Sequence, residues 1–399
     1  MKKRLKQGAI LSFLLLPLTT AVVAQDQPLQ PFVIAEVATI HSKILGEDRS
    51  IFIYNPDKNG ANLLPSYPVL YTLDENDMTL VTGLVKYLSA YNEQMSPMIV
   101  VGIDGGPTRI RDLTPTHSLI DNLGQLDSSP DSWLKDSGGS ERFAQFMRDE
   151  VMPYVEQHYR TGPFRILAGH SVGGLEAIDC LLVHPEMFDA YIAISPSLWW
   201  DKGYMFSLAK DKLNTLNGKR KFLFLADSPE TGPFTSYVHD FDALISARKP
   251  PTLEYKHMFY PTESHGSVAA KAYYDGMRYL YPEWNIAESD TSVALIKQHY
   301  QTMGVRLGYD VEPPLGMVSD WGASFLRRTG KADDALEVLK LNVKNFPRAA
   351  SVYQDLGDGY AQTGNLQEAI AAYKKALELA PNDSQIALRL KELQEKKQN

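Results

Sequence analysis

The sequence predicts an α/β fold with a mostly parallel central sheet, followed by a small all-α domain. Short apolar runs alternate with segments of helical periodicity from about residue 31 to 283, as in a parallel sheet covered on both faces. A glycine-flanked serine stands where one apolar run passes into a helix. Near the C-terminus, small and aromatic residues recur at a spacing of 34 positions.

The strands are predicted from the apolar runs. Two early runs, FVIAEVATI and SIFIYNP, are expected to pair as antiparallel strands. PVLYTLD (68–74) and MIVVGID (98–104) are continuous apolar runs ending in Asp, as is typical of buried parallel strands. Further strands are expected at FRILAG (164–169), AYIAIS (190–195), KFLFLAD (221–227) and LEYKHMFY (253–260). The stretch 104–140 is rich in Gly, Pro, Ser and Asp, and so long a loop in a compact domain is more often functional than not.

The C-terminal segment contains two units at a spacing of 34 residues. Its matched pairs are Ala323 with Gly357, Gly330 with Gly364, Ala335 with Ala369, Leu339 with Tyr373, and Pro347 with Pro381. This pattern closely resembles the tetratricopeptide repeat, a unit of two antiparallel helices. We therefore expect two repeats within 316–399, the last helix (384–396) serving as a cap. Residues 284–315 are expected to dock the repeats onto the first domain.

The N-terminus has the composition of a secretory signal peptide. A basic start precedes an apolar run of about fifteen residues, and small residues stand at Val22 and Ala24. The run is shorter than the roughly 20 apolar residues that span a bilayer. We therefore expect cleavage after Ala24, no membrane span, and export, with the bacterial periplasm as the destination.

Composition excludes several partners and cofactors. A net charge of −8 argues against binding to nucleic acid or to an anionic membrane surface. The nine histidines show no HxH or HExxH spacing, and Cys180 is the single cysteine. We therefore expect no disulfide, no metal site and no cofactor.

Ser171 stands in GHSVG, which fits the G-x-S-x-G turn of a nucleophilic serine. Gly169 and Gly173 suit a strained turn, since side chains at these positions would collide across it. The following helix directs its N-terminal N–H groups at negative charge that develops on a substrate. The structural alternative is a tight strand-to-helix turn that requires small residues and does no chemistry.

A serine hydroxyl needs a base, and in folds with this turn the chain order is serine, acid, histidine. His265 is the expected base, because PTESHGS follows a strand and precedes a helix. The acid should follow the strand KFLFLA. Glu230 is preferred, while Asp227, and less favourably Asp240 or Asp242, remain open.

Two N–H groups are expected to bind the oxyanion that forms during attack on a carbonyl. One is the backbone N–H of Val172, the residue after the serine. The second should come from the loop after PVLYTLD, around Glu75 or Asn76.

The motifs PVLYTLD, TRIRDLTPT, AGHSVGG, SPSLWWD and ESHGSV occur in this order and resemble those of the esterase D and enterochelin esterase family of α/β-hydrolases. The resemblance implies an α/β-hydrolase fold that cleaves carboxylic esters, with Ser171 as nucleophile and His265 as base. Some siderophore esterases of this type work without an effective acid. The family often has glycine where this chain has Glu75, at the expected second oxyanion donor.

Arg109, Trp199 and Trp200 are the candidate substrate-binding residues within these motifs. Of Arg109 and Arg111, one is expected to pair with Asp112 and hold the loop. The other would face the pocket and bind an anionic or catecholate-rich substrate through its planar donors. One tryptophan is expected in the core, and the other as an aromatic wall of the pocket.

The predicted protein is therefore an exported, cofactor-independent serine esterase. Its parts are a signal peptide (1–24), an α/β-hydrolase domain (25–283), a docking segment (284–315), and two repeats with a cap (316–399). A siderophore ester such as a trilactone is the favoured substrate, and an acyl- or feruloyl-carbohydrate ester is the alternative. A scaffold protein with an inactive hydrolase domain is the rival class. The repeats are expected to be structural or to contact a protein partner or a second copy of the chain.

Overall fold

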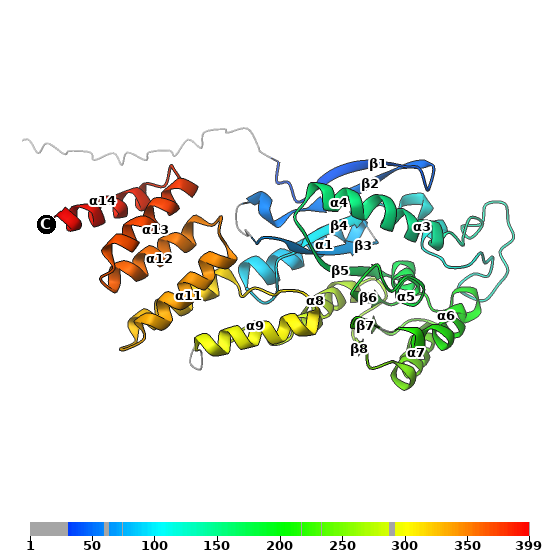
Figure 1. Cartoon of the computed structure of the whole chain (residues 1–399). Helices are drawn as coiled ribbons and strands as arrows, with labels where there is room; N and C mark the ends of the chain where they lie inside the picture. The colour runs from blue at the N-terminus through cyan, green and yellow to red at the C-terminus, as the bar shows by residue number, and fades with distance from the viewer. Residues whose placement is uncertain are drawn as a thin grey trace, which may run out of the picture. The chain divides into compact units, whose positions relative to one another are not determined.

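The computed structural model describes residues 31–59, 64–73, 75–216, 218–232, 234–286 and 292–398. Within them an eight-stranded sheet has the order β1-β2-β4-β3-β5-β6-β7-β8 (Figure 1). The strands are β1 (Glu36–Ser42), β2 (Glu47–Tyr54), β3 (Tyr67–Thr72), β4 (Ile99–Ile103), β5 (Thr161–His170), β6 (Ala190–Ile194), β7 (Lys221–Asp227) and β8 (Leu253–Phe259). The predicted signal peptide, residues 1–24, lies outside the described residues.

The sheet is parallel except at one edge. Strand β1 pairs with β2, and β2 with β4, in antiparallel register, and the six strands from β4 to β8 along the sheet are parallel. All five residues of β4 are buried, and they alternate between two cores, because successive side chains of a strand point to opposite faces. The expected mostly parallel α/β fold is confirmed.

Helices cover both faces of the sheet. One core contains side chains of α3 (Ser140–Phe146), α4 (Met152–His158), α5 (Val172–Val183), α6 (Trp200–Lys212) and α7 (Phe234–Arg248). The core on the opposite face contains side chains of α1 (Met78–Lys86), α8 (Val268–Leu280) and α9 (Val293–Leu307). In parallel strands that are covered in this way, the C-terminal ends lie at one edge of the sheet, where loops can converge on a site. A short helix, α2 (Arg109–Asp112), lies in the long loop after β4.

The C-terminal segment forms two helical pairs and a last helix. These are α10 (Leu315–Arg327), α11 (Ala332–Asn345), α12 (Ala350–Gln362), α13 (Leu366–Leu379) and α14 (Ser384–Gln398). At Gly357 a Cβ atom would lie 2.5 Å from a ring carbon of Tyr373, so only glycine permits this approach of α12 to α13. The expected all-helical tail is therefore confirmed, including a helix at the place of the cap.

The first helical pair of the tail packs against the α/β domain. Trp321 and Phe325 of α10 belong to the core that α8 and α9 form, and Phe346 belongs to the core on the opposite face. The backbone N–H of Gly316 donates to Glu93, with the nitrogen 3.0 Å from Oε1. Residues 34–399 form one compact unit, and the boundaries assigned from the sequence within it stay predictions.

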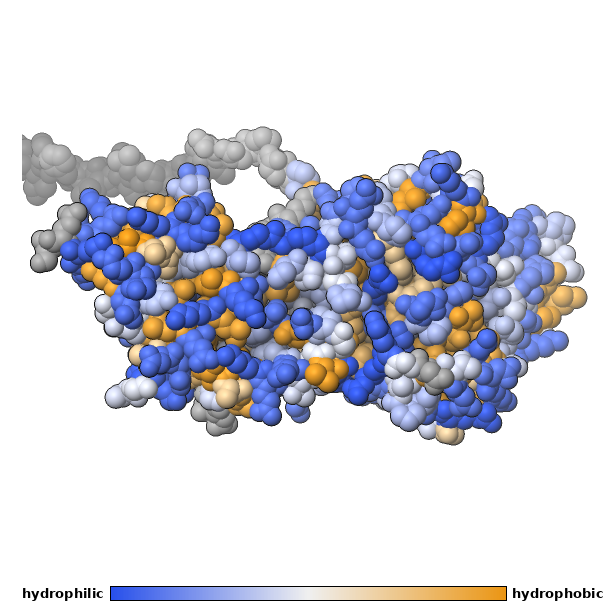
Figure 2. Space-filling model, viewed as in Figure 1, coloured by the Kyte–Doolittle hydropathy of each residue, from blue (hydrophilic) through white to orange (hydrophobic). Residues whose placement is uncertain are grey.

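The surface of the described residues is mostly hydrophilic on the face shown in Figure 2. Hydrophobic side chains lie there in small groups among hydrophilic ones, several of them over the C-terminal helices. None of the helices in the described part of the chain is both long and apolar enough to cross a membrane.

Candidate active site

Ser171 occupies the turn between β5 and α5 with a backbone conformation of φ 59° and ψ −115°. A non-glycine residue rarely adopts a positive φ, and such strain is held in place by its surroundings. Here the Ser171 N–H donates to the carbonyl of Ile194 at 2.8 Å, and its own carbonyl accepts from Ser197 N–H at 3.1 Å. The turn therefore presents the Ser171 side chain at the C-terminal edge of the sheet.

Glycines make this turn possible. A Cβ atom on Gly169 would collide with the backbone carbonyl of Gly173, and it would lie 2.9 Å from the Gly173 Cα. A Cβ atom on Gly174 would lie 2.9 Å from the carbonyl oxygen of Ile194 in the neighbouring strand β6. The collision across the turn that the sequence pattern predicts is thus present in the structure.

Ser171 and His265 line one cleft of about 580 Å³ at this edge of the sheet. His265 Nδ1 is hydrogen bonded to Glu230 Oε1 at 2.9 Å, and the Glu230 side chain is 14 % exposed. The His265 ring lies near that of His170, with the centroids 4.6 Å apart. Between the described side chains of Ser171 and His265 no hydrogen bond is present, as is common for catalytic pairs without substrate.

Two of the alternative acids, Asp227 and Asp242, contact a different histidine. Asp227 Oδ1 is 2.7 Å from His257 Nε2, and Asp242 Oδ2 is 3.2 Å from His257 Nδ1. Both carboxylates therefore contact the ring nitrogens of His257, whereas Glu230 contacts and orients His265.

Of the expected oxyanion donors, Val172 lines the cleft. It is the first residue of α5, so its N–H has no acceptor within the helix. The expected second donor falls in the short 3₁₀ turn Glu75–Asp77 after β3, and Asn76 is not among the described lining residues. The second oxyanion donor stays a prediction.

The two arginines of the long loop have different roles. Arg111 donates to Asp112 Oδ1 at 2.7 Å and to Glu47, and hydrogen bonding to Arg111 lowers the pKa of Glu47 to about 2. Arg111 thereby fastens the loop to β2. Arg109 lines the cleft and donates to the carbonyl of His170 at 2.9 Å.

Aromatic side chains form part of the cleft wall. Trp199 lines the cleft and contacts Phe234 edge-on, with ring centroids 6.1 Å apart. Trp133, from the long loop, lines it as well and is 49 % exposed. Trp200 does not line the cleft: it is 1 % exposed, and its Nε1 lies 3.2 Å from the Thr116 carbonyl oxygen. Trp200 is thus the core member of the pair, and its candidacy for substrate binding is withdrawn.

Two serines of the cleft were not predicted as site residues. Ser197 Oγ is 3.4 Å from Ser171 Oγ. Ser195 has a φ of 39°, and its buried Oγ has no hydrogen-bond partner within the described residues. Both belong to the motif SPSLWWD, which the sequence analysis singled out. The motif alone does not indicate that these two serines lie beside Ser171. A buried hydroxyl without a partner is unusual, and Ser195 is a residue of the cleft wall.

The helix that follows Ser171 carries buried carboxyl groups. Burial raises the pKa of Asp179 to about 6, against a hydrogen bond from Ser140, and burial also raises the pKa of Glu176 well above its ordinary value. These groups lie in the hydrophobic core and are not lining residues of the cleft. We assign them no role in the reaction.

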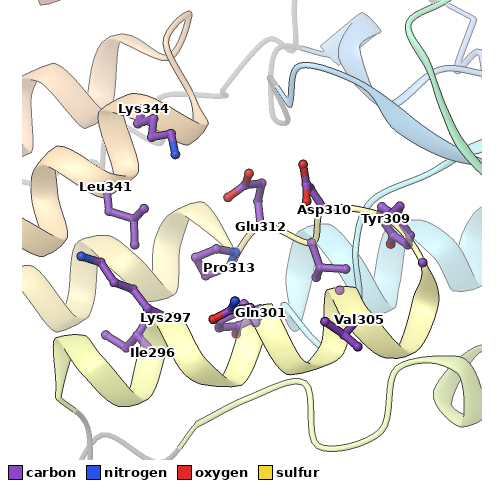
Figure 3. Close-up of a pocket in the computed structure, with 14 residues that line it drawn as sticks. Ile296, Lys297, Gln301, Val305, Tyr309, Asp310, Glu312, Pro313, Leu341 and Lys344 are labelled. Carbon is purple, nitrogen blue, oxygen red and sulfur yellow. The ribbon is translucent and has the colours of Figure 1, made fainter.

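A larger cavity, of about 620 Å³, lies away from Ser171 between α9, α11 and the segment that connects α9 to α10 (Figure 3). Its charged residues are of both signs, with Lys297 and Lys344 facing a space that also contains Asp310 and Glu312. Its described lining residues include no serine, threonine or cysteine beside a histidine. The smaller cleft, which contains Ser171 and His265, is therefore the candidate active site.

Comparison with known proteins shows what the chain is similar to. Residues 42–221 match the family model described as a putative esterase, and residues 350–383 match the tetratricopeptide repeat. The chain is 34 % identical over 183 residues to the ferri-bacillibactin esterase BesA of Bacillus subtilis, and the aligned region covers 43 % of this chain and 61 % of that protein. It is 38 % identical over 150 residues to the siderophore triacetylfusarinine C esterase of Aspergillus fumigatus, and this alignment covers 37 % of this chain and 50 % of that protein. The chain therefore spans less than two thirds of the length of these relatives.

Among solved structures, the IroE-like serine hydrolase of Shewanella oneidensis is 27 % identical, with a TM-score of 0.69. That likeness covers 78 % of this chain and 99 % of the other. The resemblance predicted from the motifs is confirmed: residues 42–221 match a putative esterase model, the chain is similar to named siderophore esterases, and a match to the tetratricopeptide repeat follows.

Proposed function

We propose that the protein is an exported serine esterase that hydrolyses siderophore esters through an acyl-enzyme. The observation that carries the proposal is the strained Ser171 turn in one cleft with the His265–Glu230 pair. The similarity to named siderophore esterases supports the substrate class. Export rests on the composition of residues 1–24.

In the proposed reaction, the Ser171 hydroxyl attacks the ester carbonyl while His265 accepts its proton. The negative charge that develops on the carbonyl oxygen is stabilised by the Val172 N–H at the start of α5. His265 then protonates the leaving alkoxide, and an acyl-enzyme remains on Ser171. Water hydrolyses this intermediate with His265 again as base. Glu230 holds His265 Nδ1 and stabilises the imidazolium.

The lining of the cleft suits a substrate with rings and negative charge. Trp133, Trp199 and Phe234 offer ring faces and edges for stacking. Arg109 brings a guanidinium group to the same wall, which pairs with anionic oxygen atoms. Aryl-bearing siderophore esters combine these features, and trilactones also present several equivalent ester bonds.

The test compares kcat/KM for iron-free and ferric trilactone siderophores with that for feruloyl and acetyl sugars. We expect the trilactones to be preferred, and Ser171→Ala to lower kcat by about 10³-fold or more while the melting temperature stays the same. Alanine keeps the strained turn and removes only the hydroxyl. Preference for the sugars would refute the siderophore assignment, and unchanged hydrolysis in the folded variant would refute the serine mechanism.

A further inference from the structure

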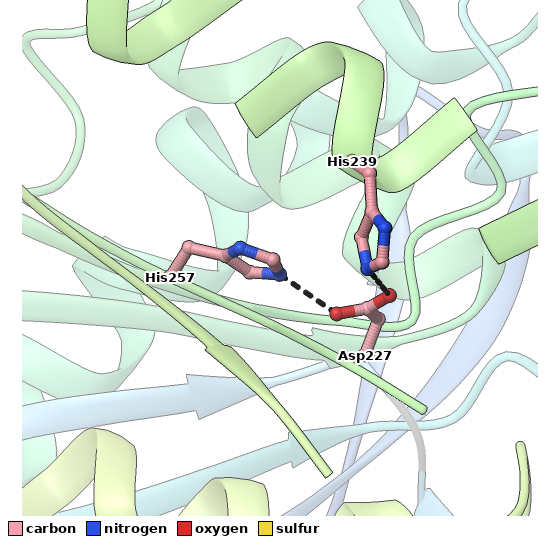
Figure 4. Close-up of side chains that lie close together, drawn as sticks. All are labelled: Asp227, His239 and His257. Carbon is pink, nitrogen blue, oxygen red and sulfur yellow. Dashed lines mark hydrogen bonds and ion pairs between the residues drawn. The ribbon is translucent and has the colours of Figure 1, made fainter. Parts of the chain in front are cut away.

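Three side chains with metal-binding atoms meet outside the cleft. Asp227 ends β7, His257 lies on β8, and His239 lies on α7. Figure 4 shows both imidazole rings turned toward the Asp227 carboxylate, His239 from the helix and His257 from the strand. One ligand atom of each residue lies within 4.8 Å of the others. Their sequence spacing fits no metal motif, because the fold brings them together from separate elements.

The Asp227 carboxylate is fully buried, with a side-chain exposure of 0 %. Its Oδ1 is hydrogen bonded to His257 Nε2 at 2.7 Å. Its Oδ2 has His239 Nε2 at 3.3 Å, but the geometry there is not that of a hydrogen bond. A buried carboxylate oxygen without a hydrogen bond is costly and calls for a further partner.

The second nitrogen of His257 is fixed by another carboxylate. His257 Nδ1 lies 3.2 Å from Asp242 Oδ2, and Asp242 Oδ1 accepts a hydrogen bond from the Tyr255 hydroxyl at 2.7 Å. In the structure Nε2 donates its proton to Asp227; a bound metal ion would take the place of that proton, while the proton on Nδ1, shared with Asp242, would keep the Nε2 lone pair directed at the ion. Histidine ligands of metals are usually oriented by a carboxylate in this way. The cluster therefore contains ligands and the group that orients one of them.

We propose that Asp227, His239 and His257 bind a divalent transition-metal ion, with Zn²⁺ as the best match. Two imidazole nitrogens and one carboxylate oxygen are a ligand set that Zn²⁺ favours, with a fourth position for water. Tetrahedral ligands about 2.0 Å from zinc lie about 3.3 Å from one another, so small side-chain rotations suffice. His239 is 46 % exposed, which gives the ion and its water access from solvent.

Such a site fastens one wall of the cleft. The ion would join α7 to the ends of β7 and β8, and α7 begins at Phe234, a lining residue. Glu230 stands three residues after Asp227, in the loop that β7 leads into. The inferred role is therefore structural: the metal holds α7 and the acid loop in place and takes no part in ester cleavage.

The experiment titrates Zn²⁺ into the full-length protein after removal of metals with a chelator, followed by calorimetry. We expect one tightly bound ion per chain and a higher melting temperature with Zn²⁺. Co²⁺ in the same site should give the visible absorption of tetrahedral coordination. His239→Ala should lose the tight site, and Asp242→Asn should weaken affinity by about 10- to 100-fold, because it orients a ligand.

The matched control is His41→Ala. His41 is also an exposed histidine beside a carboxylate, with Nδ1 2.6 Å from Asp48, but it belongs to no group of three possible metal ligands among the described residues. This variant should bind Zn²⁺ as the wild type does. Absence of tight binding by the wild type, or equal binding by His239→Ala, would overturn the proposal. Ser171→Ala should bind Zn²⁺ normally, so failure of the metal site and failure of the esterase proposal are distinguishable.

Discussion

Gly169→Ala tests whether the geometry of the serine turn controls the chemistry. The new Cβ would collide with the Gly173 carbonyl and lie 2.9 Å from its Cα, where ordinary contacts are 3.4–4 Å. The atoms in the way are backbone, so β5 and α5 must separate by about 1 Å to admit the methyl group. A misplacement of about 1 Å costs about 100-fold in rate, and overpacking costs about 1–3 kcal/mol of unfolding free energy.

The assay measures kcat/KM on a p-nitrophenyl ester together with urea unfolding. We expect kcat/KM to fall by about 100-fold and the free energy of unfolding by about 1–3 kcal/mol. Gly266→Ala is the control: it also adds a methyl group beside a proposed catalytic residue, His265, but nothing lies within 4 Å of the new Cβ. That variant should keep both values near those of the wild type. Equal behaviour of the two variants would refute the argument that close approach at Gly169 positions Ser171.

Two further predictions concern carboxyl groups. Glu230→Gln should lower kcat by about 10- to 100-fold with little change in KM, because Glu230 acts through His265 and not on the substrate. Steady-state kinetics measure both constants. An unchanged kcat would mean that Ser171 and His265 work without the acid. Asp179→Asn should stabilise the protein at neutral pH. Burial raises the Asp179 pKa from 3.8 to about 6, so the wild type loses up to about 3 kcal/mol as pH rises from about 4 to 6, while asparagine loses nothing. Urea unfolding at pH 4 and pH 7 measures the gap between variant and wild type, and an equal gap at both values would contradict this reasoning.

The fold could be predicted because its signals are local in the sequence. The fully buried strand β4 is a continuous apolar run, and each predicted run falls on a strand of the sheet. The predicted cap at 384–396 falls within the helix Ser384–Gln398. The turn at Ser171 was readable because glycines two positions before and after the serine are a steric requirement of the turn itself.

The remaining features depend on contacts between distant segments. The sequence favours Glu230 as the acid, but spacing alone does not exclude Asp227. Which carboxylate reaches His265 depends on the path of the loop after β7. For the same reason no local pattern indicates that His239 and His257 meet at Asp227. The pairing of Arg111 with Glu47 joins residues 64 positions apart, which no local pattern reveals.

The central claim, that Ser171 is an activated nucleophile, is tested most directly by labelling with a fluorophosphonate and mapping the modified peptide by mass spectrometry. The account predicts a single phosphonyl group on Ser171 of the folded wild type, slower labelling in His265→Ala, and none at this position in Ser171→Ala. Folded wild-type protein that remains unlabelled, or a label of equal extent in Ser171→Ala, would contradict it and favour a scaffold with an inactive hydrolase domain.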